Sequence, residues 1–247
     1  MLVVNGVYKS YSRGGMFSSD RQQILRDVSF AYKQGECLGI IGESGSGKST
    51  LGRLLLGIEK PERGTITLHG ESVENRSSRR GRISAVFQDY TSSINPYFTV
   101  EQAILEPLIR KRNGREVNRS KIERLLCQVG LSASFCAKYP HELSGGQIQR
   151  VCIARAIATE SSCILLDEAI SSLDGSVQMQ VLQLLKDLKD TFQLGYLFIT
   201  HDIQAAAYLC DRVLFLRSGQ IEEIVDIAQL RNVQSPYAQK LIRMMMN

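Results

Sequence analysis

The nine residues GESGSGKST, Gly42 to Thr50, constrain the fold more than any other stretch of this chain. An apolar run from Cys37 to Ile41 precedes them, and a helical pattern from Lys48 to Gly57 follows. They satisfy the pattern G-x-x-x-x-G-K-[ST] at Gly42, Gly47, Lys48 and Ser49. Glycines let the backbone curl so that N–H groups face phosphate oxygens, and the following helix presents its positive end there. The stretch therefore predicts a phosphate-binding loop between a buried strand and a helix.

Each side-chain type in this loop has a role in binding a nucleotide. The Lys48 ammonium neutralises charge on the β- and γ-phosphates, and the Ser49 hydroxyl ligates Mg²⁺. We expect ATP as the ligand and Mg²⁺ as the accompanying ion. The predicted nucleotide contacts in the loop are Gly42, Glu43, Ser44, Gly45, Ser46, Gly47, Lys48, Ser49 and Thr50.

Two further apolar strands end in polar side chains. ILLDEAISSLD (Ile164 to Asp174) places Asp167 and Glu168 at a strand end, where adjacent acids are costly without a nearby cation. Asp167 suits a Mg²⁺ ligand, and Glu168 suits the residue that orients or deprotonates the attacking water. ITHD repeats the pattern and makes His201 a candidate γ-phosphate contact.

Strand and helix patterns alternate along most of the chain. We expect strands at Leu2–Tyr8, Val28–Tyr32, Cys37–Ile41, Thr65–His69, Ile83–Phe87, Cys163–Asp167, Tyr196–Thr200 and Val213–Leu216. We expect helices at Lys48–Gly57, Val100–Lys111, Lys121–Val129, Gly145–Ala158, Ser176–Asp190 and Ile203–Cys210. The alternation predicts a parallel sheet covered by helices, and the helical block in the middle predicts an inserted second lobe.

LSGGQ, Leu143 to Gln147, lies at the start of a predicted helix. Ser144, Gly145 and Gly146 offer a second group of phosphate-facing donors, yet the chain has a single phosphate-loop lysine. We therefore expect LSGGQ to complete the site of another subunit, with ATP held between two subunits.

These motifs, in this order and spacing, resemble the ATPase subunit of an ABC transporter, and the resemblance extends over nearly the whole chain. It implies an α/β fold of the P-loop NTPase class: a RecA-like parallel-sheet core, an N-terminal antiparallel β subdomain and an inserted α-helical subdomain. It implies one ABC ATPase domain over residues 1–247, with a nucleotide-binding core at 1–99 and 160–225, a helical signature subdomain at 100–159 and a tail at 226–247.

The resemblance also implies roles for individual residues. Tyr11 matches the aromatic residue that stacks on adenine, and Gln147 completes the signature LSGGQ. Gln88 matches the glutamine that touches Mg²⁺ and links the site to the membrane partner, and Asp174 matches the aspartate that crosses the dimer interface. The implied Mg²⁺ ligands are thus Ser49, Gln88 and Asp167.

Phe87 to Val100 and the tail Ser235 to Ile242 resemble the branch that imports dipeptides, oligopeptides and nickel. Most relatives have Pro-Thr where this chain has Ala169-Ile170. The alanine, together with LFITHD, is most similar to the second ATPase subunit of nickel importers. We expect nickel as the cargo, with dipeptides, oligopeptides or a metal chelate as the alternative.

The family implies a second ATPase subunit, in a heterodimer rather than a homodimer, two transmembrane permease subunits and an extracytoplasmic solute-binding protein. No apolar stretch is long enough to span a membrane and no signal peptide is evident, so we expect a cytoplasmic protein, and the family implies a peripheral place at the cytoplasmic face of the cell membrane. Two other classes compete: a soluble ABC protein of DNA repair or translation, and a nucleotide-binding regulator that does not hydrolyse ATP. Proteins of the first class usually carry two cassettes or a long coiled-coil insertion, whereas this chain has one cassette and no long heptad run. The intact Asp167, Glu168 and His201 argue against a regulator that does not hydrolyse ATP.

The net charge of +5 is modest and concentrates in two basic stretches, Arg76 to Arg82 and Arg110 to Arg119. We interpret them as solvated loops and helix ends, with contact to anionic lipid or an acidic partner as the alternative. They lack interleaved aromatics, so no nucleic-acid partner is expected. Six scattered cysteines predict small buried side chains rather than disulfides.

Overall fold

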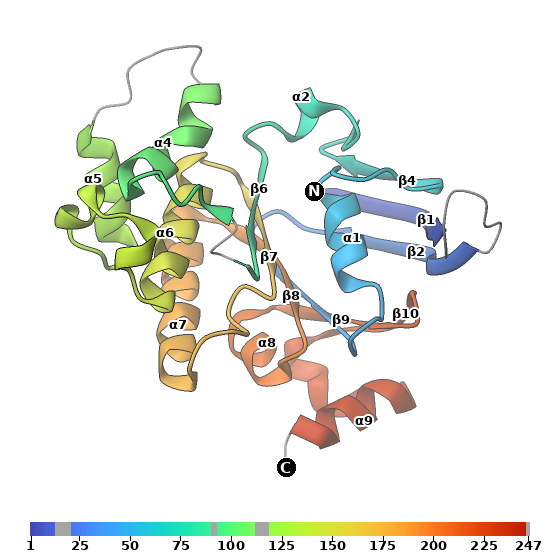
Figure 1. Cartoon of the computed structure of the whole chain (residues 1–247). Helices are drawn as coiled ribbons and strands as arrows, with labels where there is room; N and C mark the ends of the chain where they lie inside the picture. The colour runs from blue at the N-terminus through green and yellow to red at the C-terminus, as the bar shows by residue number, and fades with distance from the viewer. Residues whose placement is uncertain (13–20, 90–92, 112–118, 246–247) are drawn as a thin grey trace. The chain divides into compact units, whose positions relative to one another are not determined.

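Residues 1–12, 21–89, 93–111 and 119–245 are described by the computed structural model, in which the chain forms two units. Unit 1 comprises Met1–Arg79 and Gly195–Asn247, and unit 2 comprises Arg80–Leu194. Both ends of the chain thus belong to unit 1, whereas unit 2 is one continuous middle segment (Figure 1). The predicted division into a core, a signature subdomain and a tail stays a prediction.

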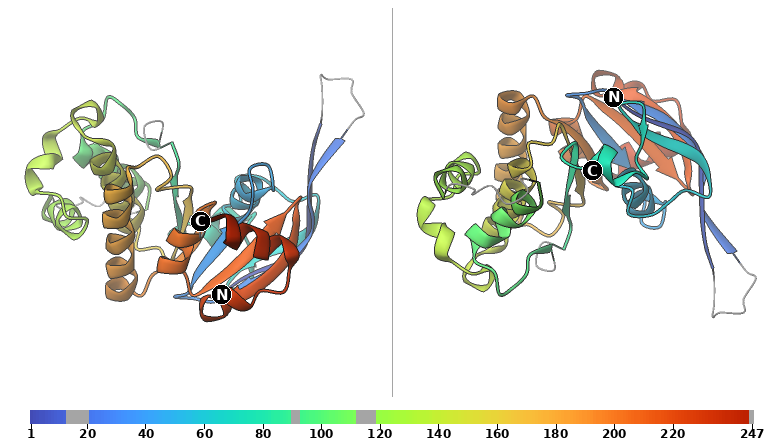
Figure 2. Two further views of the ribbon diagram at one scale, coloured as in Figure 1. Left: turned by 90° about the horizontal axis from the view of Figure 1, so that it is seen from below. Right: turned by 90° about the horizontal axis from the view of Figure 1, so that it is seen from above.

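An antiparallel sheet forms the N-terminal part of unit 1. Its strands, in the order β2-β1-β4-β5, are β2 (Arg21–Tyr32), β1 (Leu2–Ser12), β4 (Arg63–Leu68) and β5 (Glu71–Ser72). β1 and β2 run beyond their predicted apolar parts, because Tyr11 pairs with Gln22 and Ser12 with Arg21 through the backbone. Figure 2 shows these polar ends as a long two-stranded ribbon. Backbone pairing needs no apolar alternation, so the sequence pattern could not show it.

A second group of strands in unit 1 carries the phosphate-loop motif. In the order β10-β9-β3-β8 these are β10 (Gln220–Asp226), β9 (Arg212–Arg217), β3 (Cys37–Ile41) and β8 (Gly195–Thr200). β3 is parallel to both β8 and β9, and every residue of β3 and β8 is buried. Continuous apolar runs of this kind are typical of parallel strands covered on both faces, as the sequence predicted. Helices α1 (Lys48–Leu55) and α8 (Ile203–Leu209) follow β3 and β8.

Unit 2 combines a short parallel strand pair with a block of helices. β6 (Ile83–Phe87) pairs with β7 (Cys163–Asp167). The helices are α4 (Val100–Lys111), α5 (Arg119–Gln128), α6 (Gly145–Ala158) and α7 (Gly175–Phe192), with 3-10 turns at Ala133–Ala137 and Pro140–Glu142. α6 contacts α4, α5 and α7, and Figure 1 shows these helices gathered around it. Nine of its fourteen residues are buried, so α6 is the central helix of the block.

Several elements were not predicted, among them β5, β10, the three 3-10 turns including Ile227–Asn232, the short helix α2 (Arg76–Arg79) and the C-terminal helix α9 (Pro236–Met245). α2 lies in the first basic stretch, where Arg79 donates to the carbonyls of Leu56 at 2.7 Å and Gly57 at 2.6 Å. At least this arginine is thus a structural group that closes the end of α1. Most of the second basic stretch, 112–118, lies outside the described residues.

The cysteines largely follow the prediction. None of the six, all of which lie among the described residues, forms a disulfide; Cys127 is exposed, and the others are buried. The Sγ atoms of Cys37 and Cys210 lie 3.4 Å apart in the interior of unit 1. Burial raises the pKa of Cys152 to about 12, which keeps this thiol protonated and inert.

We expect Leu165→Ala to destabilise the protein strongly. Leu165 is fully buried in β7, and truncation of such a leucine leaves a cavity that costs about 2–5 kcal/mol. Met179→Ala on α7 is the control, since that side chain is 49% exposed and its loss should cost less than about 0.5 kcal/mol. Urea denaturation followed by circular dichroism measures both. Equal losses would contradict the assignment of Leu165 to the core.

Candidate functional site

The phosphate loop leaves β3 at Gly42 and enters α1 at Lys48. Gly42 allows a close backbone approach, because a Cβ there would lie 2.2 Å from the Leu216 carbonyl oxygen. Gly47 has φ +105°, a conformation that side-chain-bearing residues rarely adopt, and it caps α1. The two glycines thus allow the sharp turn between β3 and α1. The N–H groups in the first turn of α1 point toward the loop.

Lys48 is 5% exposed, and its ammonium is held by the loop itself. Its Nζ donates to the carbonyl of Gly42 at 2.7 Å and to that of Glu43 at 2.9 Å. The Ser46 hydroxyl is buried and has no hydrogen-bond partner in the structure. A buried hydroxyl without a partner is costly, so this group fits a loop that receives an oxygen-rich ligand.

His201 lies at the same sheet edge as the loop. β3 and β8 are parallel and pair Ile41 with Thr200, so Gly42 and His201 both follow directly at the carboxyl ends of neighbouring strands. The carboxylate of Asp202 accepts from the N–H groups of Gln204 at 2.8 Å and Ala205 at 3.0 Å, and so caps α8. The cap sets the exposed His201 in the strand-to-helix turn. The sequence motif contained Asp202, but its capping role was not predicted.

In unit 2, a second pair of parallel strands aligns the predicted acidic residues with Gln88 in the same way. β6 and β7 pair Phe87 with Asp167, so Gln88 and Glu168 follow at one edge. Glu168 has φ +47°, a strained backbone for a residue other than glycine. Its carbonyl accepts from the Ser171 hydroxyl at 2.9 Å and from the Ser171 N–H at 3.2 Å. The tight turn after β7 thus sets the position of Glu168.

Ala169 and Ile170, which follow the acids, are each 1% exposed. They are core residues that anchor the turn after Glu168 in unit 2, and Ile170 accepts from the Leu173 N–H at 3.2 Å. The pair therefore holds the turn by burial of apolar surface. Nothing in the structure relates it to a particular cargo.

The signature LSGGQ forms the capped start of α6. Ser144 Oγ accepts from the Gln147 N–H at 3.3 Å, and Gln147 Oε1 accepts from the Ser144 N–H at 3.0 Å. This reciprocal capping box fixes Gly145 and Gly146 in the first turn of a fourteen-residue helix. A Cβ on Gly146 would lie 2.6 Å from Val177 Cγ1, so this glycine also permits the close packing of α7. Asp174 precedes α7, is exposed, and makes no side-chain capping bond.

Tyr11 is held by a polar cluster in unit 1. Its hydroxyl donates to Glu59 Oε2 at 2.6 Å and accepts from Arg53 Nη2 at 3.2 Å. Arg53 lies on α1 and pairs with Glu59 at 2.7 Å, while the Lys9 ammonium lies 5.4 Å from the Tyr11 ring centroid. Burial would raise the pKa of Glu59, but hydrogen bonds from Tyr11, Lys9 and Arg53 outweigh it and hold that pKa below its usual value.

The structure thus brings together two sets of predicted residues. Unit 1 places the phosphate loop and His201 at one strand edge and joins Tyr11 to the loop helix through Arg53. Unit 2 places Gln88, Asp167 and Glu168 at another strand edge, with the signature on α6 and Asp174 before α7. The Mg²⁺ ligands draw on both units and stay a prediction. Arg53 and Glu59 were not predicted, because neither belongs to a motif.

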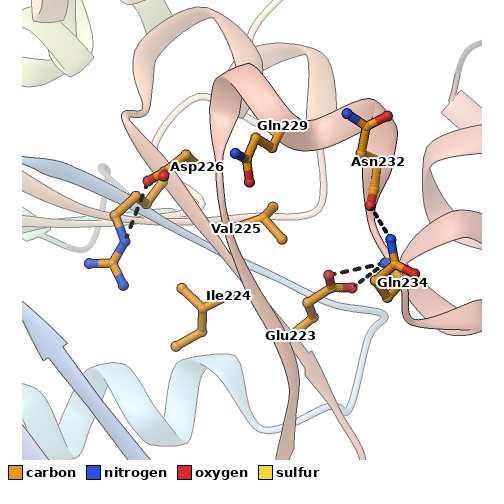
Figure 3. Close-up of a pocket in the computed structure, with 8 residues that line it drawn as sticks. Glu223, Ile224, Val225, Asp226, Gln229, Asn232 and Gln234 are labelled. Carbon is orange, nitrogen blue, oxygen red and sulfur yellow. Dashed lines mark hydrogen bonds and ion pairs between the residues drawn. The ribbon is translucent and has the colours of Figure 1, made fainter.

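Two pockets lie outside these sets. In unit 2, a cavity of about 400 Å³ is lined by Ala85, Val86, Phe87, Asp89, Ser93, Cys152 and Arg155, next to Gln88 in sequence. Arg155 Nη2 bonds Glu106 at 2.7 Å, and Arg155 Nη1 donates to the Ser93 carbonyl at 2.9 Å. In unit 1, a polar hollow of about 630 Å³ lies along β10, where Glu223 points at Gln234 (Figure 3).

Comparison with known proteins identifies a family and several close relatives. Residues 25–171 match the family model described as ABC transporter. A metal-staphylopine import system ATP-binding protein of Staphylococcus aureus is 47% identical over 98% of both chains. An oligopeptide transport ATP-binding protein of Bacillus subtilis is 42% identical over 93% of this chain and 73% of its own. A nickel import ATP-binding protein of Shigella flexneri is 42% identical over 90% of this chain and 86% of its own.

A solved structure supports the fold. One chain of the dimeric structure of an ATP-binding cassette in a post-hydrolysis state, bound to ADP and Pi, superposes with a TM-score of 0.81. The identity is 30%, over 92% of this chain and 99% of the other. Among the described residues, no helix has the length and apolar character needed to cross a membrane.

We expect Gly42→Ala to disrupt the phosphate loop. The added Cβ would meet the Ser46 hydroxyl and the Leu216 carbonyl, and the latter is a backbone atom that cannot rotate away as a side chain can. Overpacking of this kind costs about 1–3 kcal/mol, and a cost of that size in the binding geometry of the loop corresponds to a loss of ATP affinity of about 5- to 150-fold. Titration with a fluorescent ATP analogue measures the affinity. Gly175→Ala is the control, because no atom lies within 4 Å of the added Cβ; equal affinities for the two variants would contradict the close approach at Gly42.

Proposed function

The chain belongs to the ABC transporter family, and from this premise we propose that it hydrolyses ATP to drive an import complex. The observation that carries the proposal is the phosphate loop: Lys48 is buried among loop carbonyls, the Ser46 hydroxyl has no hydrogen-bond partner among the described residues, and α1 begins at the same point. Such a loop suits the phosphates of ATP.

The predicted fold class and branch are confirmed. The chain has the P-loop ABC ATPase fold, with an antiparallel β part, a parallel-strand core and a helical part. Its relatives are ATP-binding proteins of metal-staphylopine, oligopeptide and nickel importers. It is therefore an importer ATP-binding subunit of this branch.

The residues of unit 1 bind and orient the nucleotide in the proposed mechanism. Backbone N–H groups from the loop to the start of α1 receive the phosphate oxygens, and Lys48 neutralises their charge. The Tyr11 ring, held in place by Glu59 and Arg53, offers a flat face to adenine. Ser49, exposed in the first turn of α1, offers a hydroxyl to Mg²⁺, and in unit 2 Gln88 and Asp167 offer oxygen ligands of the kind that this ion prefers; when bound, the ion would withdraw charge from the phosphates.

Glu168 acts as the general base in the proposed hydrolysis. Its carboxylate accepts a proton from a water, the water oxygen bonds the γ-phosphorus, and the bond from that phosphorus to the bridging oxygen breaks to leave ADP. His201 contacts the γ-phosphate. The strained φ of Glu168 supports this role, because such strain persists where the surrounding turn imposes it and concentrates at functional sites.

We propose that the signature acts on ATP bound by a second ATPase subunit. The capping box fixes the first turn of α6, and the N–H groups at that end would complete the partner's phosphate site. Asp174 makes no capping bond and would reach across the interface. The resemblance to the branch that imports dipeptides, oligopeptides and nickel favours a heterodimer over a homodimer.

Two permeases and an extracytoplasmic solute-binding protein complete the proposed complex, at the cytoplasmic face of the membrane. The cavity lined by Phe87, Asp89 and Arg155 supports this proposal, because it adjoins Gln88 and combines apolar with charged walls. A permease segment bound there would contact the residues on both sides of Gln88 and so respond when Gln88 moves.

The cargo we propose is a transition-metal ion, nickel among them, imported as a complex with a small chelator. The metal-staphylopine relative, at 47% identity over almost all of both chains, favours a chelate over a peptide. The oligopeptide and nickel relatives are equally identical, at 42%, and do not separate their cargoes. Free nickel is the second candidate, favoured by Ala169 and the LFITHD stretch.

We expect Glu168→Gln to bind ATP and to lose hydrolysis by at least about 100-fold, since the amide cannot accept the proton. Lys48→Ala should lose binding itself. Phosphate release and equilibrium binding of a fluorescent ATP analogue separate the two effects, measured on the assembled complex. Full turnover by Glu168→Gln would remove the proposed role of that residue.

Uptake by cells tests the cargo. We expect cells with Glu168→Gln to lose uptake of labelled nickel supplied as the staphylopine complex, and to retain uptake of a labelled tripeptide. Labelled nickel without chelator distinguishes the second candidate. Unchanged metal uptake together with lost peptide uptake would assign the protein to peptide import.

A further inference from the structure

The C-terminal helix reaches the phosphate loop through one side chain. Tyr237, on α9, is 5% exposed, and its hydroxyl accepts from the backbone N–H of Glu43 at 3.0 Å. The two residues lie 194 positions apart in the chain. Glu43 is the first residue of the loop after Gly42, so the contact falls at the point where the loop leaves β3.

Tyr237 and Lys48 hold the same peptide unit from opposite sides. The Glu43 N–H and the Gly42 carbonyl belong to one peptide bond, and the structure has no cis peptide in its described residues. In a trans peptide the N–H and the carbonyl point in opposite directions. The N–H donates to Tyr237, while the carbonyl accepts from Lys48 Nζ at 2.7 Å. The tyrosine therefore sets the orientation of a carbonyl that holds the lysine ammonium.

The tyrosine hydroxyl is itself held in place. It lies 3.5 Å from the Leu216 carbonyl oxygen, the atom that Gly42 approaches so closely. The Arg217 guanidinium lies 5.1 Å from the ring centroid, within the range of a cation–π contact. Burial raises the pKa of Tyr237, so the hydroxyl stays protonated at neutral pH and can both accept and donate.

The start of α9 is fixed by a second set of bonds. Glu223, on β10, accepts from the N–H group of Gln234 at 3.0 Å (Figure 3) and from that of Ser235 at 2.8 Å. Ser235 Oγ accepts from the Ala238 N–H at 3.4 Å, and Pro236 takes the first helical position, where its missing N–H costs nothing. The sequence SPY thus encodes a cap, a helix start and the side chain that contacts the loop.

We propose that Tyr237 is a positioning residue for ATP binding, which acts through the Gly42–Glu43 peptide on the Lys48 ammonium. This inference rests on the proposed function of the same site. It assigns to the C-terminal helix a direct part in the nucleotide site, beyond that of a tail that packs on the core.

Tyr237→Phe tests the proposal, because it removes the hydroxyl and keeps the ring. The net value of one such hydrogen bond corresponds to a change of about 3- to 10-fold in affinity. We expect the dissociation constant of a fluorescent ATP analogue and the KM for ATP to rise by that factor, with kcat at saturating ATP within about twofold of wild type. Tyr8→Phe, in β1, is the matched control and should change neither quantity.

A purely structural tyrosine would give a different pattern. Tyr237→Ala loses the ring as well and should lower the melting temperature in either case. Unchanged ATP affinity in Tyr237→Phe, beside a lowered melting temperature in Tyr237→Ala, would overturn the proposal and leave the ATPase assignment standing. If the wild-type protein fails to bind ATP, or if Lys48→Ala binds as tightly as wild type, both the proposed function and this inference fall.

Discussion

The close approach of Gly42 to the Leu216 carbonyl is the constraint on which the proposed nucleotide site depends. β3 is wholly buried between parallel neighbours, and the chain can leave it beside β9 because Gly42 has no side chain. From that point the Gly42–Glu43 peptide holds the lysine on one side and meets the C-terminal helix on the other. Alignment of the β3 and β8 ends brings His201 to the same edge.

In unit 2, as in unit 1, the alignment of parallel strand ends positions the candidate functional side chains. Parallel pairing of β6 and β7 aligns Gln88 with the acids, and a strained turn then sets Glu168. Ala169 and Ile170 are buried and support that turn by burial of apolar surface. Each unit thus uses a buried strand as a rigid base and a short turn to direct one reactive group.

Much of this arrangement could be predicted from local pattern. The apolar runs of β3 and β7, the glycine spacing of the loop and the capped start of α6 are short-range features, and the structure confirms the elements that they predict. The polar ends of β1 and β2 and the short strand β10 could not be predicted in this way, because backbone pairing with a distant segment forms them. The cluster of Arg53, Glu59 and Tyr11 likewise joins residues with no motif in common.

The sequence by itself predicted the chemistry: a loop suited to phosphate, acids at one strand end, a histidine at the end of another strand, and a signature for a second subunit. These follow from residue types at fixed short spacings, where backbone geometry leaves few alternatives. Only the tertiary structure decided what holds those groups in place, as Tyr237 shows. Its partner lies 194 positions away, and the bond exists because folding brings α9 against the end of β3, which no spacing along the chain encodes.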